Sequence, residues 1–206
     1  MTIIILIVKH ELENFLMGHS QEEKADSHDR ILQVAAAYFR EHGVEGIGVA
    51  DLMKAAGLTH GGFYRHFASR DELVAEAIER ALYEGARAVN AVANSKDAPL
   101  AALIESYLSP KHRDNLAASC AVTTLAADVA RSNHRARSAY TRQVGNYLEL
   151  LTKLVAGRDQ KSRRKKAIAA LSTLVGAVSI ARAVNDEHLS REVLKSAAHE
   201  LKAQLR

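Results

Sequence analysis

The alternation of apolar and polar residues between positions 48 and 67 predicts two short helices joined by a tight turn. In the first helix the apolar residues recur at spacings of three and four and therefore share one buried face; they are Val49, Leu52, Met53, Ala55 and Ala56. We expect this helix to stop at Gly57, because glycine readily takes the left-handed conformation that ends a helix. Thr59 can then cap the next helix through its hydroxyl.

The second predicted helix, which begins near Thr59, has one packing face and one free face. Phe63 and Phe67 lie four positions apart and share the packing face, whereas most of the polar residues fall on other faces; these are Thr59, His60, Tyr64, Arg65 and His66. Gly61 and Gly62 are poor helix formers, but they leave the backbone bare for close approach to a phosphate chain. The pattern predicts a helix-turn-helix that contacts DNA.

Amphipathic segments on both sides complete a three-helix unit. The preceding helix, 28–43, has an apolar face made of Ile31, Leu32, Val34, Ala35, Tyr38 and Phe39, and a long helix follows from Ser69. Two short helices with a glycine turn also occur in other small helical proteins. The DNA-binding interpretation therefore depends on this context, in which three helices enclose one small core.

The rest of the chain also reads as helices, so we expect an all-α protein. The expected helices cover residues 71–93, 99–108, 121–131, 136–155, 167–184 and 190–205. Proline occurs only at positions 99 and 110, where the first can begin a helix and the second breaks one. The helix at 71–93 would link an amino-terminal domain to a larger carboxy-terminal domain whose helices enclose a cavity.

The order and spacing of residues 27–87 resemble the TetR family of bacterial transcriptional regulators. The resemblance rests on Arg30-Ile31-Leu32, Ala35-Ala36, Phe39, Gly43, Val49, Ala56-Gly57-Leu58-Thr59, Gly62-Phe63-Tyr64, His66-Phe67 and Asp71-Glu72-Leu73. It implies a homodimer whose amino-terminal helices bind a DNA operator and whose carboxy-terminal domain binds a small-molecule effector. The implied domains are an extension at 1–26, a helix-turn-helix domain at 27–73, and a ligand-binding and dimerisation domain at 74–206.

The resemblance also implies which residues contact the operator: Thr59, His60, Gly61, Tyr64, His66 and Arg70. Thr59 would touch phosphate, Tyr64 would offer its hydroxyl to phosphate or a base edge, and His66 would donate to phosphate. Arg70 would reach phosphate from the following helix. His60 can instead be a bystander.

Two positions depart from the family pattern. Relatives often have lysine where this chain has Arg70, which keeps the charge and adds a planar fork. They often have serine or threonine where Gly48 stands, so the loss of that hydroxyl predicts lighter phosphate anchoring here. Since Gly61 and Gly62 carry no base-reading group, we expect part of the specificity to come from DNA shape.

For the effector cavity, the family implies candidate lining residues at Leu103, Tyr107, Cys120, Leu125 and Tyr147. Each of them can equally be an ordinary core residue. Cys120 lies at an expected helix start, where backbone dipoles favour a reactive thiolate and hence a redox role. Some relatives have Gly-Cys-Pro where this chain has Ser119-Cys120-Ala121, so inert packing is the simpler interpretation.

Composition and charge agree with a globular regulator. The 206 residues are 48% hydrophobic and 25% charged, and the net charge of +4 with a pI near 9.2 is compatible with a polyanion partner without requiring one. The single cysteine excludes a disulfide framework within one chain and suits the cytoplasm. The basic run Lys161–Lys166 is more typical of a solvated loop and helix start than of a nucleic-acid patch.

Catalytic motifs are missing from the sequence. It contains no GxSxG, HExxH or GxxxxGK[ST] pattern, and His112-Arg113-Asp114 matches a kinase tripeptide by letters only. His60 and His66 have no third metal ligand nearby in the sequence. We therefore expect no enzyme, no cofactor and no metal site. A helical interaction module that does not bind DNA stays open as an alternative.

The amino terminus carries a separate apolar run, Ile3 to Val8. The run is too short to cross a bilayer, which takes about 20 residues, and it lacks the features of a secretory signal. We therefore expect neither export nor a membrane partner. Met17 followed by polar residues is a more natural start, so residues 1–16 can be an annotation artefact; the alternative is a native strand or helix that docks on the body.

The last two predicted helices carry small and apolar residues that suit an interface between two copies of the chain. As the family implies, two helices from each subunit would form a four-helix dimer interface. Two reading heads about 34 to 36 Å apart reach successive major grooves, so the expected operator is roughly palindromic. We expect repression that a ligand relieves, while activation stays open.

Overall fold

The computed structural model describes residues 2–94 and 98–205, with side chains from residue 21 onward, and every regular element in this part is helical. The elements are α1 (Thr2–His42), η1 (Val44–Gly46), α2 (Val49–Ala55), η2 (His60–Arg65), α3 (Arg70–Asn94), α4 (Pro99–Tyr107), α5 (Pro110–Asp114), α6 (Ala121–Thr124), α7 (Ala126–Ala130), α8 (His134–Leu154), α9 (Gln160–Ala183) and α10 (Glu187–Gln204). The elements η1 and η2 are 3-10 helices. The expected all-α fold is confirmed.

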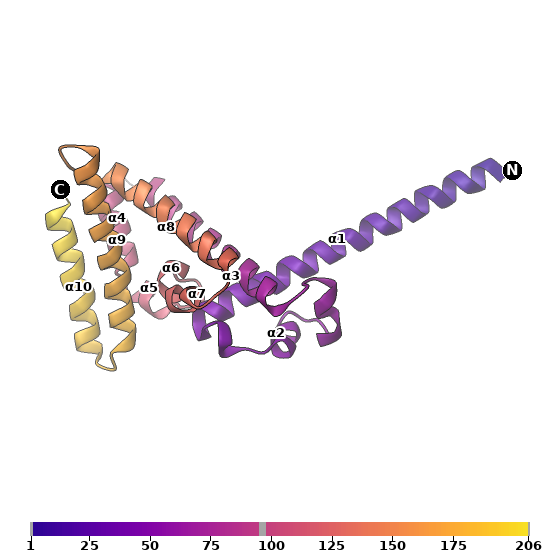
Figure 1. Ribbon diagram of the computed structural model, residues 1–206, viewed down its shortest axis with the longest axis horizontal. Helices are drawn as coiled ribbons and strands as arrows, with labels where there is room; N and C mark the ends of the chain where they lie inside the picture. Colours follow the sequence, from indigo (N-terminus) through magenta and orange to yellow (C-terminus); the bar gives the residue numbers. More distant parts are fainter. Residues whose placement is uncertain (1, 95–97, 206) are drawn as a thin grey trace.

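The second half of α1, α2, η2 and the start of α3 form the amino-terminal unit (Figure 1). Its centre consists of buried side chains from all four elements, among them Ile31, Phe39, Met53, Phe63 and Leu73. Gly43 and Gly57 have φ angles of 78° and 72°, so they take the left-handed conformation that ends α1 and α2. The predicted stop at Gly57 is therefore confirmed.

A single helix, α3, joins the amino-terminal unit to the rest of the chain. It packs against α1, α4 and α8. Arg40 on α1 pairs with Glu84 on α3, and Arg135 on α8 pairs with Glu79 on α3. The predicted domain boundary between residues 73 and 74 falls inside this continuous helix. The amino-terminal unit and the rest of the chain therefore share α3, and a movement of this helix would displace residues in both.

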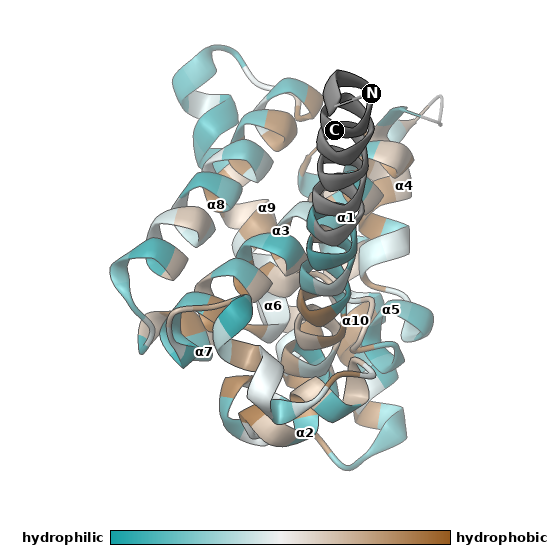
Figure 2. Ribbon diagram, turned by 90° about the vertical axis from the view of Figure 1, so that its right-hand side faces the viewer, coloured by the Kyte–Doolittle hydropathy of each residue, from teal (hydrophilic) through white to brown (hydrophobic). Residues whose placement is uncertain are grey.

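The carboxy-terminal part is a helical bundle in which α9 packs between α8 and α10. Apolar and polar residues alternate along these helices (Figure 2), and the buried apolar ones include Leu151 on α8, Leu174 and Val178 on α9 and Leu194 on α10. Among the described residues, α9 alone is long and apolar enough to cross a membrane by length and composition, and 39% of that window is buried inside the protein. A core helix has the same properties, so this feature does not by itself indicate a membrane segment.

Several expected boundaries differ from the structure. The helix expected at 121–131 is broken at Leu125 into α6 and α7, and the stretch expected to be irregular after Pro110 begins with α5. The basic run lies within the first turns of α9, because Asp159 caps that helix by accepting a hydrogen bond from the Ser162 amide at 2.7 Å. Residues 95–97 of the expected loop lie outside the described part of the chain.

The apolar run at the amino terminus belongs to α1, and Figure 1 shows this end of the helix continuing beyond the other helices. Whether residues 1–16 are native stays a prediction.

Candidate nucleic-acid interface and buried cavity

Two buried phenylalanines hold the candidate DNA-reading segment against the amino-terminal core. Phe63 and Phe67 are each 2% exposed, and their ring centroids lie 5.6 Å apart. The second helix of the motif, η2, begins beside Thr59 as predicted, but it is a 3-10 helix and ends at Arg65. Two glycines in its first turn disfavour the α-helix, and a bond from the Gly62 amide to the Thr59 carbonyl, 3.0 Å, closes the tighter turn.

While Phe63 and Phe67 are buried, the polar residues at the start and middle of η2 face solvent. Tyr64 is 76% exposed, and its ring meets Phe63 edge-on at 5.2 Å. Thr59, His60 and Gly61 are also exposed. The structure thus brings four of the six predicted operator residues to one exposed segment of the chain, where their polar atoms are available to a partner.

Thr59 does not cap η2 as expected. It occupies the N-cap position with φ −82° and ψ 148°, but its side chain makes no capping hydrogen bond. Its backbone carbonyl closes the turn instead, because the 3-10 geometry directs the Gly62 amide to that oxygen. The hydroxyl is consequently left for a partner outside the motif.

His66 lies half-buried between η2 and α1. Its ring centroid is 6.2 Å from that of His28, and its Nδ1 is buried without a hydrogen-bond partner among the described residues. Burial lowers the pKa of His66, and the positive charges of His28, Lys24 and Arg65 lower it further. A neutral ring at this position can still donate one N–H to a phosphate oxygen.

Arg70 is engaged by an acidic neighbour. Its guanidinium donates to both Glu45 carboxylate oxygens at 3.0 and 3.1 Å, and to the Val44 carbonyl at 2.9 Å. This fork fixes the start of α3 to η1, so a phosphate contact by Arg70 would compete with Glu45. Sequence reasoning did not single out Glu45, because no local pattern links two residues 25 positions apart.

A small cavity lies between α3, α4 and the segment that leads into α6. Its volume is about 100 Å³, and it is lined by Gly85, Ala88, Val89, Val92, Leu103, Ser106, Tyr107, His112, Ala118 and Cys120. A second cavity of about 30 Å³ shares Val89, Leu103 and Tyr107 with it and adds Tyr147, Leu150, Leu151, Leu171 and Leu174. Four of the five predicted effector residues therefore line these two cavities, whereas Leu125 is fully buried elsewhere in the core.

The polar side chains around the cavity are bonded to one another. The Tyr107 hydroxyl pairs with the Thr123 hydroxyl at 2.5 Å, and the Cys120 thiol donates to the Tyr147 hydroxyl at 3.8 Å. Burial raises the pKa of both tyrosines, and the neighbouring Cys120 raises it further. Both phenols therefore stay neutral at physiological pH.

His112 organises one wall of the cavity. Its Nδ1 lies 2.7 Å from the Tyr107 carbonyl, while its Nε2 accepts from the Cys120 amide at 3.2 Å and pairs with the Ser119 hydroxyl at 3.0 Å. These partners place the proton on Nδ1, and burial, assisted by Arg182, lowers the pKa of the ring. The sequence signals no such role, because His112 lies in a short polar segment without periodicity.

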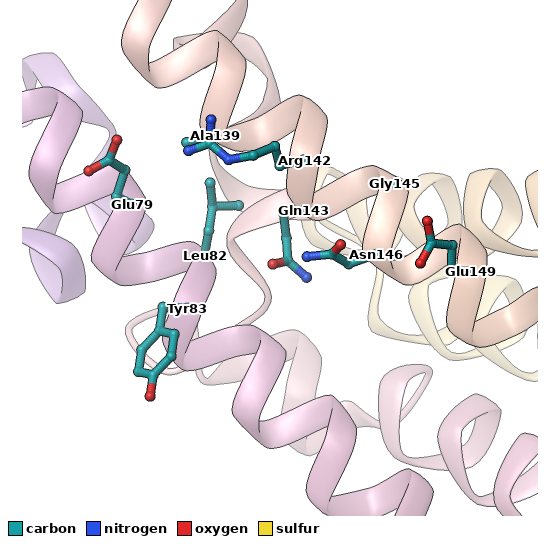
Figure 3. A pocket seen from close by; sticks show the side chains of 9 residues that line it. All are labelled: Glu79, Leu82, Tyr83, Ala139, Arg142, Gln143, Gly145, Asn146 and Glu149. Carbon is teal, nitrogen blue, oxygen red and sulfur yellow. The ribbon is translucent and has the colours of Figure 1, made fainter.

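A larger groove of about 640 Å³ is open between α3 and α8 (Figure 3). Its walls are mostly polar; they include Glu79, Tyr83, Arg142, Gln143, Asn146 and Glu149. The Glu79 carboxylate already pairs with Arg135 at 2.8 Å. None of the predicted effector residues lines this groove. In the described part of the chain, no group of three or more His, Cys, Asp or Glu side chains is placed to hold a metal ion.

Comparison with known proteins agrees with the geometry of the amino-terminal unit. Residues 31–77 match the family described as "Bacterial regulatory proteins, tetR family". The chain is 34% identical over 56 residues to the HTH-type transcriptional repressor KstR2 of Mycolicibacterium smegmatis, and 42% identical over 48 residues to that of Mycobacterium tuberculosis. These matches cover 27% and 23% of this chain, and they span only 27% and 24% of the length of the two relatives.

The whole fold also has counterparts among solved structures. A TetR transcriptional regulator from Chloroflexus aurantiacus superposes with a TM-score of 0.75 at 20% identity, over 90% of this chain and 98% of that one. The reduced form of NemR from Escherichia coli superposes with a TM-score of 0.72 at 18% identity, over 88% and 97%. Residues 31–77 thus match the tetR family model, and the fold of the chain as a whole resembles that of solved TetR-type regulators.

Proposed function

We propose that this regulator is an effector-responsive repressor, which binds a palindromic operator as a cytoplasmic homodimer and is released by a small molecule. The observation that carries the proposal is the exposed polar surface of η2, with Tyr64 76% exposed above two buried phenylalanines. This places a phenol hydroxyl, a donor to phosphate and to base edges, in solvent beside Thr59, His60 and Gly61, which are also exposed. DNA is the partner that the helix-turn-helix geometry fits.

In this proposal each of the residues around η2 makes a different contact with the operator. Tyr64 offers its hydroxyl to a phosphate or a base edge, and Thr59 and His66 donate to phosphates. Gly61 has nothing within 4 Å of the place where a Cβ would lie, so the bare backbone allows close approach of the DNA. Arg70 joins these contacts when phosphate replaces Glu45 as its partner.

The dimer would form through α9 and α10. Ile168 and Ile180 on α9 are 47% and 54% exposed, and Leu189 on α10 is 41% exposed. Packing these side chains against a second copy would remove them from water and place two reading heads on one face of the DNA. Each head alone would bind weakly, whereas two heads joined by the dimer act together.

The cavity beside α3 would hold the effector. Gly85 lines the cavity from α3, and the same helix begins at Arg70 beside η2. Some conformations of the dimer would hold the two helix-turn-helix units at a distance that does not match successive major grooves. A ligand that prefers such a conformation would therefore weaken DNA binding. A ligand with equal affinity for both conformations would have no such effect.

Binding of the purified protein to the DNA that flanks its own gene tests the proposal, measured by fluorescence anisotropy across salt concentrations. We expect site-selective, salt-sensitive binding that Tyr64→Phe weakens by about 10- to 100-fold, since a hydrogen bond to a charged group contributes about 1.5 to 3 kcal/mol. Tyr83→Phe is the matched control, because Tyr83 is 61% exposed on α3, away from η2. Equal, weak binding of all sequences that neither change affects would contradict the DNA-reading role and favour an interaction module.

A further inference from the structure

Gly85 is a buried glycine in the interior of the long helix α3, where glycine is an unfavourable residue. Its backbone does not require glycine, because among the described residues only Gly43 and Gly57 have a positive φ. Its surroundings do not require glycine either. A Cβ at this position would lie 3.5 Å from the Tyr147 hydroxyl oxygen and 3.8 Å from the Cys120 Cα, which are ordinary contacts. Alanine would therefore fit and would favour the helix.

A methyl group at Gly85 would reduce the free volume of the adjacent cavity. Gly85 lines the cavity of about 100 Å³, and a Cβ there would contact Cys120, which lines the same cavity, and Tyr147, which lines its neighbour. In a volume this small a single methyl group removes a large fraction of the room for a ligand. Proteins commonly lose some stability at positions that serve function, and a glycine that weakens its helix but keeps a cavity open fits this pattern.

The chemistry of the walls restricts what the cavity can hold. No Asp, Glu, Lys or Arg side chain lines either cavity. Tyr107, His112 and Cys120 are already hydrogen-bonded to neighbouring protein groups. A guanidinium behind the wall, that of Arg182, donates to the Arg113 and His112 carbonyls and to the Ser119 hydroxyl at 2.9, 2.8 and 2.6 Å. Ser106 adds only a neutral hydroxyl, so a charged ligand would lose hydration without meeting an opposite charge in the walls.

We propose that this cavity binds a small, uncharged and largely apolar molecule, and that Gly85 sets the size of ligand that fits. The inference rests on the effector role proposed above, because it names the class of effector for that site. It distinguishes this small cavity, whose walls carry no charge, from the larger groove between α3 and α8, whose charged and amide side chains suit polar ligands (Figure 3). A cavity of about 150 Å³ with apolar walls is known to accept benzene, so benzene is a suitable probe of this class.

The test measures benzene binding to the full-length protein by methyl chemical shifts at Val89 and Leu103 and by the thermal unfolding midpoint. We expect benzene to shift these methyl signals and to raise the midpoint of the wild type, while benzoate, the charged analogue, does neither. Gly85→Ala should fold, should unfold at a higher temperature without ligand, and should bind benzene about tenfold more weakly, because the added methyl overfills the site.

Gly145→Ala is the matched control. Gly145 also lies inside a long helix with nothing within 4 Å of its Cβ position, but it lines the open groove and not the cavity. Its benzene affinity should equal that of the wild type. Benzoate binding as strong as that of benzene, no benzene binding at all, or unchanged benzene affinity in Gly85→Ala would each overturn the proposal. Operator binding of the same samples is measured separately, so failure of the DNA-reading role is distinguishable from failure of this inference.

Discussion

At the scale of single residues, Arg70 and Glu45 illustrate how one ion pair can moderate DNA affinity. Glu45 is 83% exposed and places a negative charge beside the predicted phosphate contacts, while its carboxylate occupies the guanidinium of Arg70. An exposed pair of this kind adds little stability, typically about 0 to 1 kcal/mol. Its main consequence would be on binding, because Arg70 must exchange one anionic partner for another.

We therefore predict that Glu45→Gln strengthens operator binding. The change removes a negative charge that repels the DNA, and it leaves Arg70 free to bind a phosphate. One additional phosphate contact should make the slope of log K against log salt concentration more negative by about 0.9. Anisotropy titrations at several salt concentrations measure both effects. Glu41→Gln changes the net charge equally on α1, where the carboxylate is 3.6 Å from His42 rather than beside Arg70. An equal gain in both variants would mean that net charge alone is responsible.

His112 makes the stability of the cavity wall sensitive to pH. Burial lowers the pKa of the folded-state ring below its ordinary value of 6.5, so the unfolded chain binds a proton more readily than the folded one. This contribution to stability is complete above about pH 6.5 and is lost as the pH falls through the folded-state pKa. Protonation would also remove the acceptor at Nε2 that the Cys120 amide uses.

We accordingly predict that the free energy of unfolding falls between pH 7.5 and pH 5.5, and that it falls less in His112→Gln. Urea unfolding at both pH values measures the difference. His66 has a lowered pKa for similar reasons, so His66→Gln should flatten the remaining pH dependence. Identical pH profiles in the wild type and His112→Gln would show that the ring does not titrate as described.

At the scale of elements, Arg40 joins α1 to both walls of the cavity. Its side chain is 5% exposed and donates to Glu84 on α3 at 2.8 Å and to the Ala117 carbonyl at 2.6 Å. Glu84 precedes Gly85, and Ala117 precedes Ala118, so each of these two anchors lies next to a lining residue. A ligand that pushed the two walls apart would therefore strain the bonds of Arg40.

We predict that Arg40→Lys uncouples the cavity from the DNA-reading head. Lysine keeps the charge near Glu84 but cannot bond both walls at once, so residues 115–120 should exchange their amide protons faster. The change should cost about 1 to 3 kcal/mol of stability through unsatisfied buried carbonyls. Arg80→Lys is the control, because Arg80 bonds Asp29 and Glu84 without touching that segment. Similar exchange rates in both variants would contradict the coupling.

The elements also show how far the sequence alone could predict the structure. The ends of the helices at Gly43 and Gly57 were predictable, because a glycine directly after a periodic run of apolar residues commonly ends a helix by taking the left-handed conformation. The 3-10 form of η2 was not, since it depends on the Gly62 amide meeting the Thr59 carbonyl over the packed Phe63. Exposure of Tyr64 followed from the helical face of Phe63 and Phe67.

The cavity was predictable only in part. Leu103, Tyr107, Cys120 and Tyr147 were expected there from family resemblance, and the structure brings them together. Gly85 and His112 were not expected, because their roles arise from long-range packing between α3, α5 and α6. Leu125 was expected at the cavity but fills the core where α6 meets α7, since the helix breaks at that residue.

At the scale of the whole molecule, dimerisation through α9 and α10 is open to a direct test. Ile180→Glu places a charge on a side chain that is 54% exposed in one chain, so the fold should lose less than about 0.5 kcal/mol. In the proposed dimer the same charge would be buried without a partner, which is costly. Light scattering should then report 22.5 kDa monomers, with operator affinity strongly reduced. Tyr83→Glu is the control, and a dimer that persists in Ile180→Glu would place the interface elsewhere.

Because α3 is continuous, its length determines how far a small tilt displaces its ends. Its 25 residues form a rod about 37 Å long, at about 1.5 Å per residue. A tilt of about 5° around the cavity end would displace the Arg70 end by about 3 Å, and two subunits together would alter a head spacing of about 34 to 36 Å by up to twice that amount. In the proposed dimer, a small tilt of α3 would therefore be enough to lose the match to the DNA repeat, while the helices on either side keep their internal packing.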